Sequence, residues 1–137
     1  MARRKLNHEG TLILDSEGLS KLLADDEQVV ALVAEARSRG MEVVISALTI
    51  IEAAHARTNK SRLKWVLSGL RVVPVGDEEA RAASELLAGV GLHGHKYAID
   101  AAVAEAALRQ HRPVVMLTSD IDDMVKLCGD RVRLVAA

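Results

Sequence analysis

Four acidic residues stand where a strand is expected to end or a helix to begin: Asp15, Glu52, Asp100 and Asp120. Carboxylates that converge at low dielectric repel one another strongly unless cations balance them. No matching set of lysines or arginines accompanies these acids, so a divalent cation is the natural compensation. Carboxylate and water ligands suit Mg²⁺ or Mn²⁺, which activates water and neutralises charge on a phosphodiester. The pattern therefore favours metal-assisted hydrolysis.

Each of these acids also has a purely structural interpretation, because carboxylates are common helix caps and favour the first turn of a helix. Taken alone, Asp100 is more simply explained as a cap. Asp15 is harder to explain in this way, since it follows an aliphatic run at a point where the chain is expected to be buried. Glu52 interrupts the otherwise apolar stretch LTIIEAA. Together the acids favour a site over a set of unrelated caps.

Aliphatic runs alternate with segments of helical periodicity along the chain. The runs predict strands over residues 11–15, 41–46, 71–75, 113–118 and 132–136, with Pro74 marking the third as an edge strand. Periodicity predicts helices over residues 17–24, 27–39, 47–59, 60–70, 77–90, 99–110 and 119–129, and Ser16 is a candidate cap for the first. We therefore predict an α/β fold with a mostly parallel sheet covered on both faces. Functional groups gather at the carboxyl ends of strands in such a sheet.

A second motif, in the stretch GVGLHG, places Gly89, Gly91 and Gly94 in the spacing of the dinucleotide-binding fingerprint G-x-G-x-x-G. That fingerprint has physical meaning only when the glycines end a strand and open a helix. Here they follow a helical segment, so we expect Gly89 and Gly91 to end that helix and residues 91–97 to form a loop. Nucleotide binding at this loop is not favoured.

The composition excludes several classes of protein. The 137 residues carry 18 basic and 19 acidic side chains, so no overall field draws the chain to nucleic acid or to an anionic membrane. Trp65 and Tyr97 are the only aromatic residues, which argues against a base-stacking platform for single strands. Cys128 is the single cysteine, and no spacing of cysteine and histidine indicates a zinc site.

The length fits one domain. We expect residues 1–10 to be a flexible basic N-terminal tail and residues 11–137 to form a single domain. No apolar run is long enough for a signal peptide or a membrane span, and the lone cysteine suits a reducing compartment. We therefore expect a cytoplasmic protein without membrane contact.

Four short motifs, LILD, TIIEAA, YAIDAAVAEAAL and LTSD, occur in the order and spacing of the PIN domain. The chain resembles this family over about residues 11–135, and more narrowly the VapC-type ribonuclease toxins of bacterial toxin–antitoxin modules. The resemblance implies a three-layer α/β/α PIN-like nuclease domain that cuts RNA with Mg²⁺ or Mn²⁺. It also implies a homodimer that a small antitoxin protein usually holds inactive.

By this resemblance the acidic metal-binding and catalytic set of the family corresponds to Asp15, Glu52, Asp100 and Asp120, and the hydroxyl residue before the last acid to Thr118. Three of the four acids would hold the cation, while Glu52 would either ligate it or orient the attacking water. Asp123 extends the metal-binding set in one interpretation. In the other, Asp122 and Asp123 belong to a solvated helix start, and at most one of them faces inward.

Basic residues near the predicted acidic pocket are candidates for contact with substrate phosphates. His93, His95 and Lys96 flank the pocket in sequence, and solvated loop residues are the alternative interpretation. Arg57 belongs to a further basic cluster around Trp65, with Lys60, Arg62 and Lys64. This cluster is expected to guide RNA or to receive an acidic antitoxin segment. The alternative is a solvated face with Trp65 packed inward.

The predicted function is that of a metal-dependent endoribonuclease, the toxin of a toxin–antitoxin pair. A non-catalytic PIN-like module that binds RNA or protein is the alternative from another class, although such a module would normally have lost one or more of the acids. A dehalogenase-like phosphatase requires a second Asp two residues after the first, where this chain has Glu17. A phosphoreceiver domain requires a late lysine after the fourth strand, where this chain has TSD.

Overall fold

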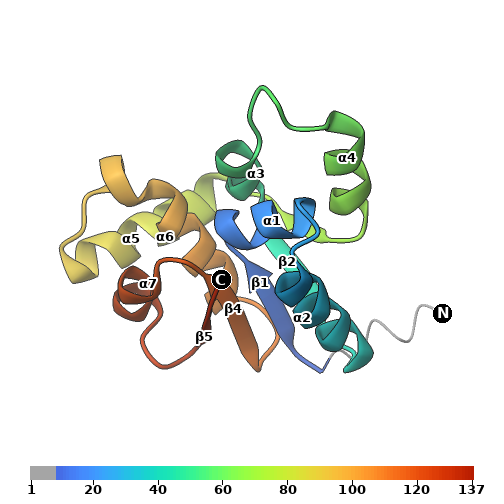
Figure 1. Cartoon of the computed structure of the whole chain (residues 1–137). Helices are drawn as coiled ribbons and strands as arrows, with labels where there is room; N and C mark the ends of the chain where they lie inside the picture. Colours follow the sequence, from blue (N-terminus) through green and yellow to red (C-terminus); the bar gives the residue numbers. More distant parts are fainter. Residues whose placement is uncertain (1–8) are drawn as a thin grey trace.

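Figure 1 shows a central sheet with helices on both faces, in a computed structural model that describes residues 9–137. The five strands of the described chain pair in the order β3-β2-β1-β4-β5, and every neighbouring pair is parallel. The strands are β1 (Thr11–Leu14), β2 (Glu42–Ser46), β3 (Arg71–Val73), β4 (Val114–Thr118) and β5 (Arg133–Ala136). The seven helices of residues 9–137 are α1 (Ser16–Leu23), α2 (Glu27–Ser38), α3 (Ala47–Ala53), α4 (Lys60–Ser68), α5 (Asp77–Val90), α6 (Gly94–Leu108) and α7 (Ile121–Cys128). The predicted three-layer α/β/α fold is confirmed.

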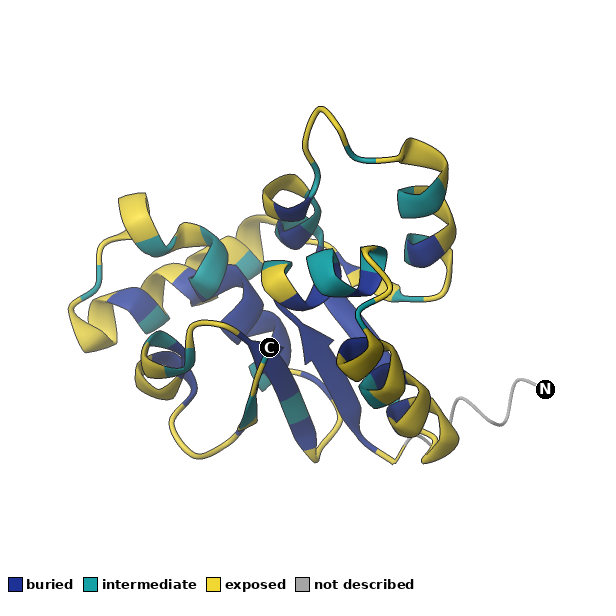
Figure 2. Cartoon of the chain, viewed as in Figure 1, coloured by how far each residue is buried: buried dark blue, intermediate teal, exposed yellow. Residues whose placement is uncertain are grey.

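The two faces of the sheet carry separate apolar layers. Ile13, Val44 and Met116 belong to a buried cluster with side chains of α5, α6 and α7. Leu12 and Ile45 belong to a second cluster with side chains of α1, α2, α3 and α4. Successive residues of a strand point to opposite faces, so the central strand β1 is buried along its whole length and is dark blue in Figure 2. A strand that is covered on both faces has a continuous aliphatic sequence, as β1 does.

The chain enters β1 through fixed contacts at the amino end of the sheet. Residues 1–8, most of the predicted N-terminal tail, lie outside the described residues. The last two tail residues are hydrogen-bonded: the Glu9 N–H donates to the Gly40 carbonyl (3.2 Å), and the Glu42 N–H donates to the Gly10 carbonyl (3.1 Å). Backbone hydrogen bonds to the rest of the domain therefore begin before β1.

Two helix boundaries near the predicted acidic pocket differ from expectation. Asp15, and not Ser16, is the N-cap of α1, since its side chain accepts the Gly18 N–H. The helix predicted over residues 47–59 ends at Ala53. After this end the His55 N–H donates to Thr58 Oγ1 (2.9 Å), a side-chain bond that competes with continued helix.

The glycine motif belongs to helices on both sides. Gly91 has a φ of +70° and is the C-cap of α5, as predicted, while Gly89 lies inside that helix. The loop predicted over residues 91–97 is shorter than expected, because α6 already begins at Gly94. Tyr97 has non-helical angles (φ −113°, ψ 18°), so a kink separates this first turn from the rest of α6. The element directly before the motif is the helix α5 and not a strand, so the dinucleotide fingerprint has no structural basis here.

We predict opposite effects of adding a methyl group at two glycines. Gly10 has a φ of +125°, and a Cβ there would lie 2.5 Å from the Pro113 carbonyl oxygen, so Gly10→Ala is expected to destabilise the protein by about 2 kcal/mol or more. A Cβ on Gly89 would meet no atom within 4 Å beyond its chain neighbours and the backbone of its own helix, so Gly89→Ala should stabilise by about 0.5 kcal/mol. Urea unfolding measures both, and a stable Gly10→Ala protein would contradict the close approach.

Candidate functional site

Asp15 is held at the carboxyl end of the central strand by backbone groups from two other segments. Its side chain is buried, with 4% of its surface exposed. One carboxylate oxygen accepts the Gly18 N–H of α1 (2.9 Å), and the other accepts the Ser119 N–H after β4 (3.0 Å). Its own N–H donates to the Leu117 carbonyl (3.0 Å). The position and direction of this carboxylate are therefore fixed by the fold.

Asp120 is fixed at the end of the neighbouring strand β4 by the hydroxyl of Thr118. Thr118 is fully buried, and its Oγ1 accepts the Asp120 N–H (2.9 Å). Asp120 occupies the N-cap position of α7, yet its carboxylate makes no capping hydrogen bond within the described chain. The hydroxyl residue predicted from the motif thus orients the backbone of the last acid and leaves its carboxylate available.

Asp100 lies half-buried in α6, after the kink at Tyr97. Its pKa is raised from 3.8 to about 6, with burial as the largest cause, followed in decreasing order by the negative charges of Asp120, Glu52, Asp123 and Asp15. All the charged groups that shift this pKa are acids. The structure therefore brings Asp100 into one electrostatic site with the other predicted acids.

The pKa of Asp120 is raised for the same physical reasons. Burial is the largest cause, followed by the negative charges of Asp15, Asp123 and Glu52. Asp123 is half-buried, whereas Asp122 is exposed. Of the two adjacent acids, the structure therefore brings Asp123 to the acidic site and leaves Asp122 in solvent.

The acids fit a divalent cation by charge and by donor type. The donors are carboxylate oxygens, which Mg²⁺ and Mn²⁺ prefer, and a dication would offset the repulsion that raises the pKa of Asp100 and Asp120. Within residues 9–137, however, no three Asp, Glu, His or Cys side chains are arranged to hold a metal ion. Glu52 is exposed, although its charge acts on both Asp100 and Asp120. The acidic cluster thus has the chemistry of a cation site without a closed ligand set.

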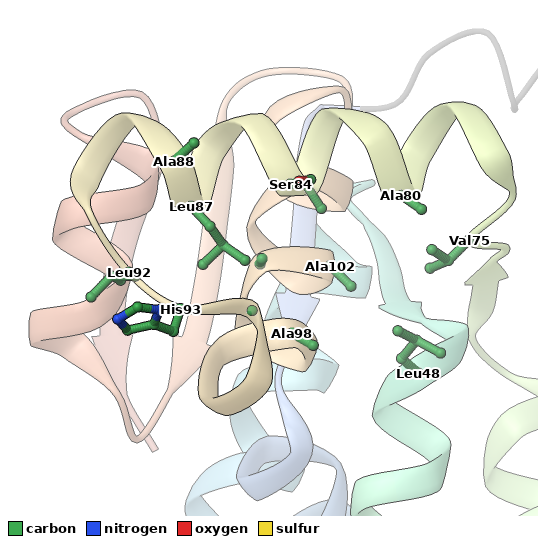
Figure 3. A pocket seen from close by; sticks show the side chains of 13 residues that line it. Leu48, Val75, Ala80, Ser84, Leu87, Ala88, Leu92, His93, Ala98 and Ala102 are labelled. Atoms are coloured by element: carbon green, nitrogen blue, oxygen red, sulfur yellow. The ribbon is translucent and has the colours of Figure 1, made fainter.

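The basic residues after α5 lie at the surface. His93, His95 and Lys96 are exposed, and the Lys96 ammonium lies 5.3 Å from the centre of the Tyr97 ring. His93 lines an apolar cavity of about 430 Å³, together with Leu87 of α5 and residues of α3 and α6. Figure 3 shows this cavity with the imidazole at its rim. His93 therefore faces the α5 side of α6.

Trp65 does not pack inward, which overturns one interpretation of the basic cluster. Its side chain is 68% exposed on α4, and the Arg62 guanidinium lies 5.3 Å from the ring centre. Arg62 also pairs with Asp25 (2.5 Å). Trp65 borders a groove of about 600 Å³ between α2 and α4, which includes Val30 and Arg37. Arg57 is exposed on the loop that follows α3.

The chain shares its fold with known proteins. The family model of the PIN domain matches residues 12–128. VapBC2 from Rickettsia felis, in a structure with a DNA fragment from its promoter, superposes with a TM-score of 0.69 and 16% identity, covering 93% of this chain and 98% of that chain. FitAB bound to an IR36 DNA fragment gives 0.67 and 19%, covering 92% and 94%. FitAcB from Neisseria gonorrhoeae gives 0.57 and 18%, covering 90% and 96%. No curated protein matches the chain.

The raised pKa of Asp100 predicts a pH-dependent effect of neutralising it. The ionised form is disfavoured in the folded protein, so folding loses stability as the pH rises from about 4 to about 6, and the loss persists above that window. In a chelating buffer, the thermal midpoint of Asp100→Asn minus that of wild type should increase across this window and then level off. Asp122→Asn, at an exposed acid, is the matched control. A difference independent of pH would contradict the convergence of the acids.

Proposed function

This chain belongs to the PIN domain family, whose members are generally nucleases, and on that premise we propose that it is a metal-dependent endoribonuclease, the toxin of a toxin–antitoxin pair. The observation that carries the proposal is the convergence of carboxylates at the ends of neighbouring strands. Burial and four other acids raise the pKa of Asp100 to about 6. Groups with strongly shifted pKa values of this kind are common at catalytic sites.

In the proposed site Asp15, Asp100 and Asp120 would hold Mg²⁺ or Mn²⁺, with Asp123 beside them. The cation, when bound, would make water a better nucleophile and stabilise the negative charge that develops on the phosphodiester. Asp15 contributes a carboxylate whose direction two backbone N–H groups fix. Thr118 holds the backbone of Asp120 in place. Glu52, at the exposed side of the site, ligates the cation or orients the attacking water.

The substrate and partners follow from the same proposal. RNA would approach the open, exposed side of the acids, where Arg57, His95 and Lys96 are available for phosphates. We propose one nuclease domain over residues 11–137 that acts on cytoplasmic RNA as a homodimer. No helix of residues 9–137 is long and apolar enough to cross a membrane.

A cognate antitoxin is the proposed protein partner. The similarity to VapBC2 and FitAB, both of them bound to a DNA fragment in their structures, supports this partner. In this chain the groove between α2 and α4 combines the exposed Trp65 ring with the guanidinium groups of Arg37 and Arg62. Such a groove suits a segment that has both apolar and acidic side chains. We therefore assign it to the antitoxin.

A non-catalytic PIN-like binding module is the alternative function. The observation that favours it is that no described acids are arranged as a closed ligand set. The two functions differ in metal affinity, because a binding module has no need of a cation at the acidic cluster. Calorimetric titration with Mn²⁺ therefore separates them.

We predict that purified protein cleaves a total RNA pool into discrete fragments with Mn²⁺ or Mg²⁺, and that EDTA prevents this cleavage. Asp15→Asn keeps the shape of the side chain and removes its charge, so it should lower the cleavage rate on the order of 100-fold or more. Asp122→Asn removes an exposed charge next to the site and should leave the rate unchanged. Gel analysis of the fragments measures all three proteins.

Two results would count against the nuclease proposal. Equal loss of cleavage in Asp15→Asn and Asp122→Asn would show that the acidic set has no special role. Absence of both cleavage and Mn²⁺ affinity in the wild-type protein would transfer the assignment to the binding module.

A further inference from the structure

Thr49, in the middle of α3, has a buried hydroxyl that makes no hydrogen bond. None of its surface is exposed, and its Oγ1 has no partner among the described residues. A threonine inside a helix usually either points to solvent or donates to a carbonyl of the preceding turn. Burial of an unpaired hydroxyl lowers stability, and such exceptions in native proteins call for a specific explanation. Thr118, buried just as completely, has a hydrogen-bond partner.

The direction of Thr49 follows from its two neighbours in α3. Leu48 lines the apolar cavity beside α5 and α6 and points toward it in Figure 3. Ile50 packs against the cluster on the opposite face of the sheet, which contains side chains of α1 and α2. Successive helical residues are about 100° apart, so Thr49 faces the seam between these two layers. On either side of this seam α3 packs against α1 and α6.

That seam leads to the acidic site. Asp15 caps the first turn of α1, and Asp100 lies in α6. Glu52 follows Thr49 by three residues, which places both on one side of α3, one turn apart. A hydroxyl can donate one hydrogen bond, and an ionised carboxylate can only accept. Thr49 therefore offers an unused donor beneath the acid of α3.

We propose that Thr49 is a positioning residue for Glu52. Its hydroxyl donates a hydrogen bond to the Glu52 carboxylate when this side chain turns from solvent toward Asp15 and Asp100, as it does when the acids gather around a cation. The inference rests on the proposed function, since it concerns the arrangement of the same site. This role explains why an unfavourable buried hydroxyl occurs at this position, since the Thr49 hydroxyl has no acceptor until the Glu52 side chain turns inward.

A purely structural role of Thr49 and a role in positioning Glu52 predict different results for Thr49→Val. If the Thr49 hydroxyl were merely an unpaired buried group, Thr49→Val would raise stability and leave metal affinity and turnover unchanged. Under the proposal, Thr49→Val also raises the thermal midpoint, by about 4 °C, because it removes the unpaired hydroxyl. It then weakens Mn²⁺ affinity and lowers kcat by about 10-fold or more each, as loss of a group that orients a ligand does.

The experiment compares wild type, Thr49→Val, Thr49→Ser and Thr11→Val in thermal unfolding, Mn²⁺ calorimetry and RNA cleavage kinetics. Thr49→Ser keeps the hydroxyl and should retain wild-type affinity and kcat. Thr11 is a buried threonine at the other end of the sheet whose hydroxyl donates to the His111 carbonyl (2.9 Å). Thr11→Val should therefore lower the thermal midpoint without changing Mn²⁺ affinity, which is the reverse of Thr49→Val.

The outcomes distinguish failure of the Thr49 proposal from failure of the proposed nuclease function. Wild-type Mn²⁺ affinity and kcat in Thr49→Val, or equal impairment of Thr49→Ser and Thr49→Val, would overturn the role of Thr49 alone. A wild-type protein that neither binds Mn²⁺ nor cleaves RNA would overturn the proposed function, and the inference with it.

Discussion

The carboxylate of Asp15 connects three segments that are far apart in the sequence. It accepts N–H groups from Gly18, at the start of α1, and from Ser119, after β4, while the Asp15 N–H donates to Leu117 within β4. A buried carboxylate without such partners would be strongly unfavourable. These bonds allow a charge to remain at the end of the central strand, and they also set how β4 and the loop after it lie beside β1. The place of Asp120, three residues after Leu117, follows from this arrangement.

The strand order gathers the remaining acids around the same point. β1 lies between β2 and β4, so the helix that follows β2 and the turn that follows β4 both begin beside Asp15. Glu52 comes from the first and Asp120 from the second, and α6 adds Asp100. Burial, together with the repulsion between these acids, opposes ionisation of Asp100 and Asp120. The site is therefore a region of the fold that contains unfavourable electrostatic interactions. The buried hydroxyl of Thr49, which has no hydrogen-bond partner, is a further unfavourable feature of this region.

Most of the fold and the membership of the acidic site were predictable from the sequence, because both depend on strong local patterns. Strands buried on both faces are continuous aliphatic runs, and parallel strands bring the residues after them to one edge. The helix ends were less predictable: a side-chain hydrogen bond between His55 and Thr58 follows α3, and one turn of helix precedes the kink at Tyr97. Neither the hydrogen bond after α3 nor the kink at Tyr97 changes the hydrophobic periodicity of the sequence. Likewise, the exposure of Trp65 and the missing partner of Thr49 depend on tertiary packing, which a single sequence does not display.

The central position of β1 determines when the acidic site can form during synthesis of the chain. β1 is made first, yet its second neighbour, β4, begins 100 residues or so later in the chain, at Val114. On the ribosome, a nascent chain that ends before Ser119 lacks one of the two groups that hold Asp15, and it lacks Asp120 altogether. The acids thus cannot form one site on an unfinished chain. The proposed activity of this site would therefore be absent from a nascent chain until β4 has emerged and paired with β1.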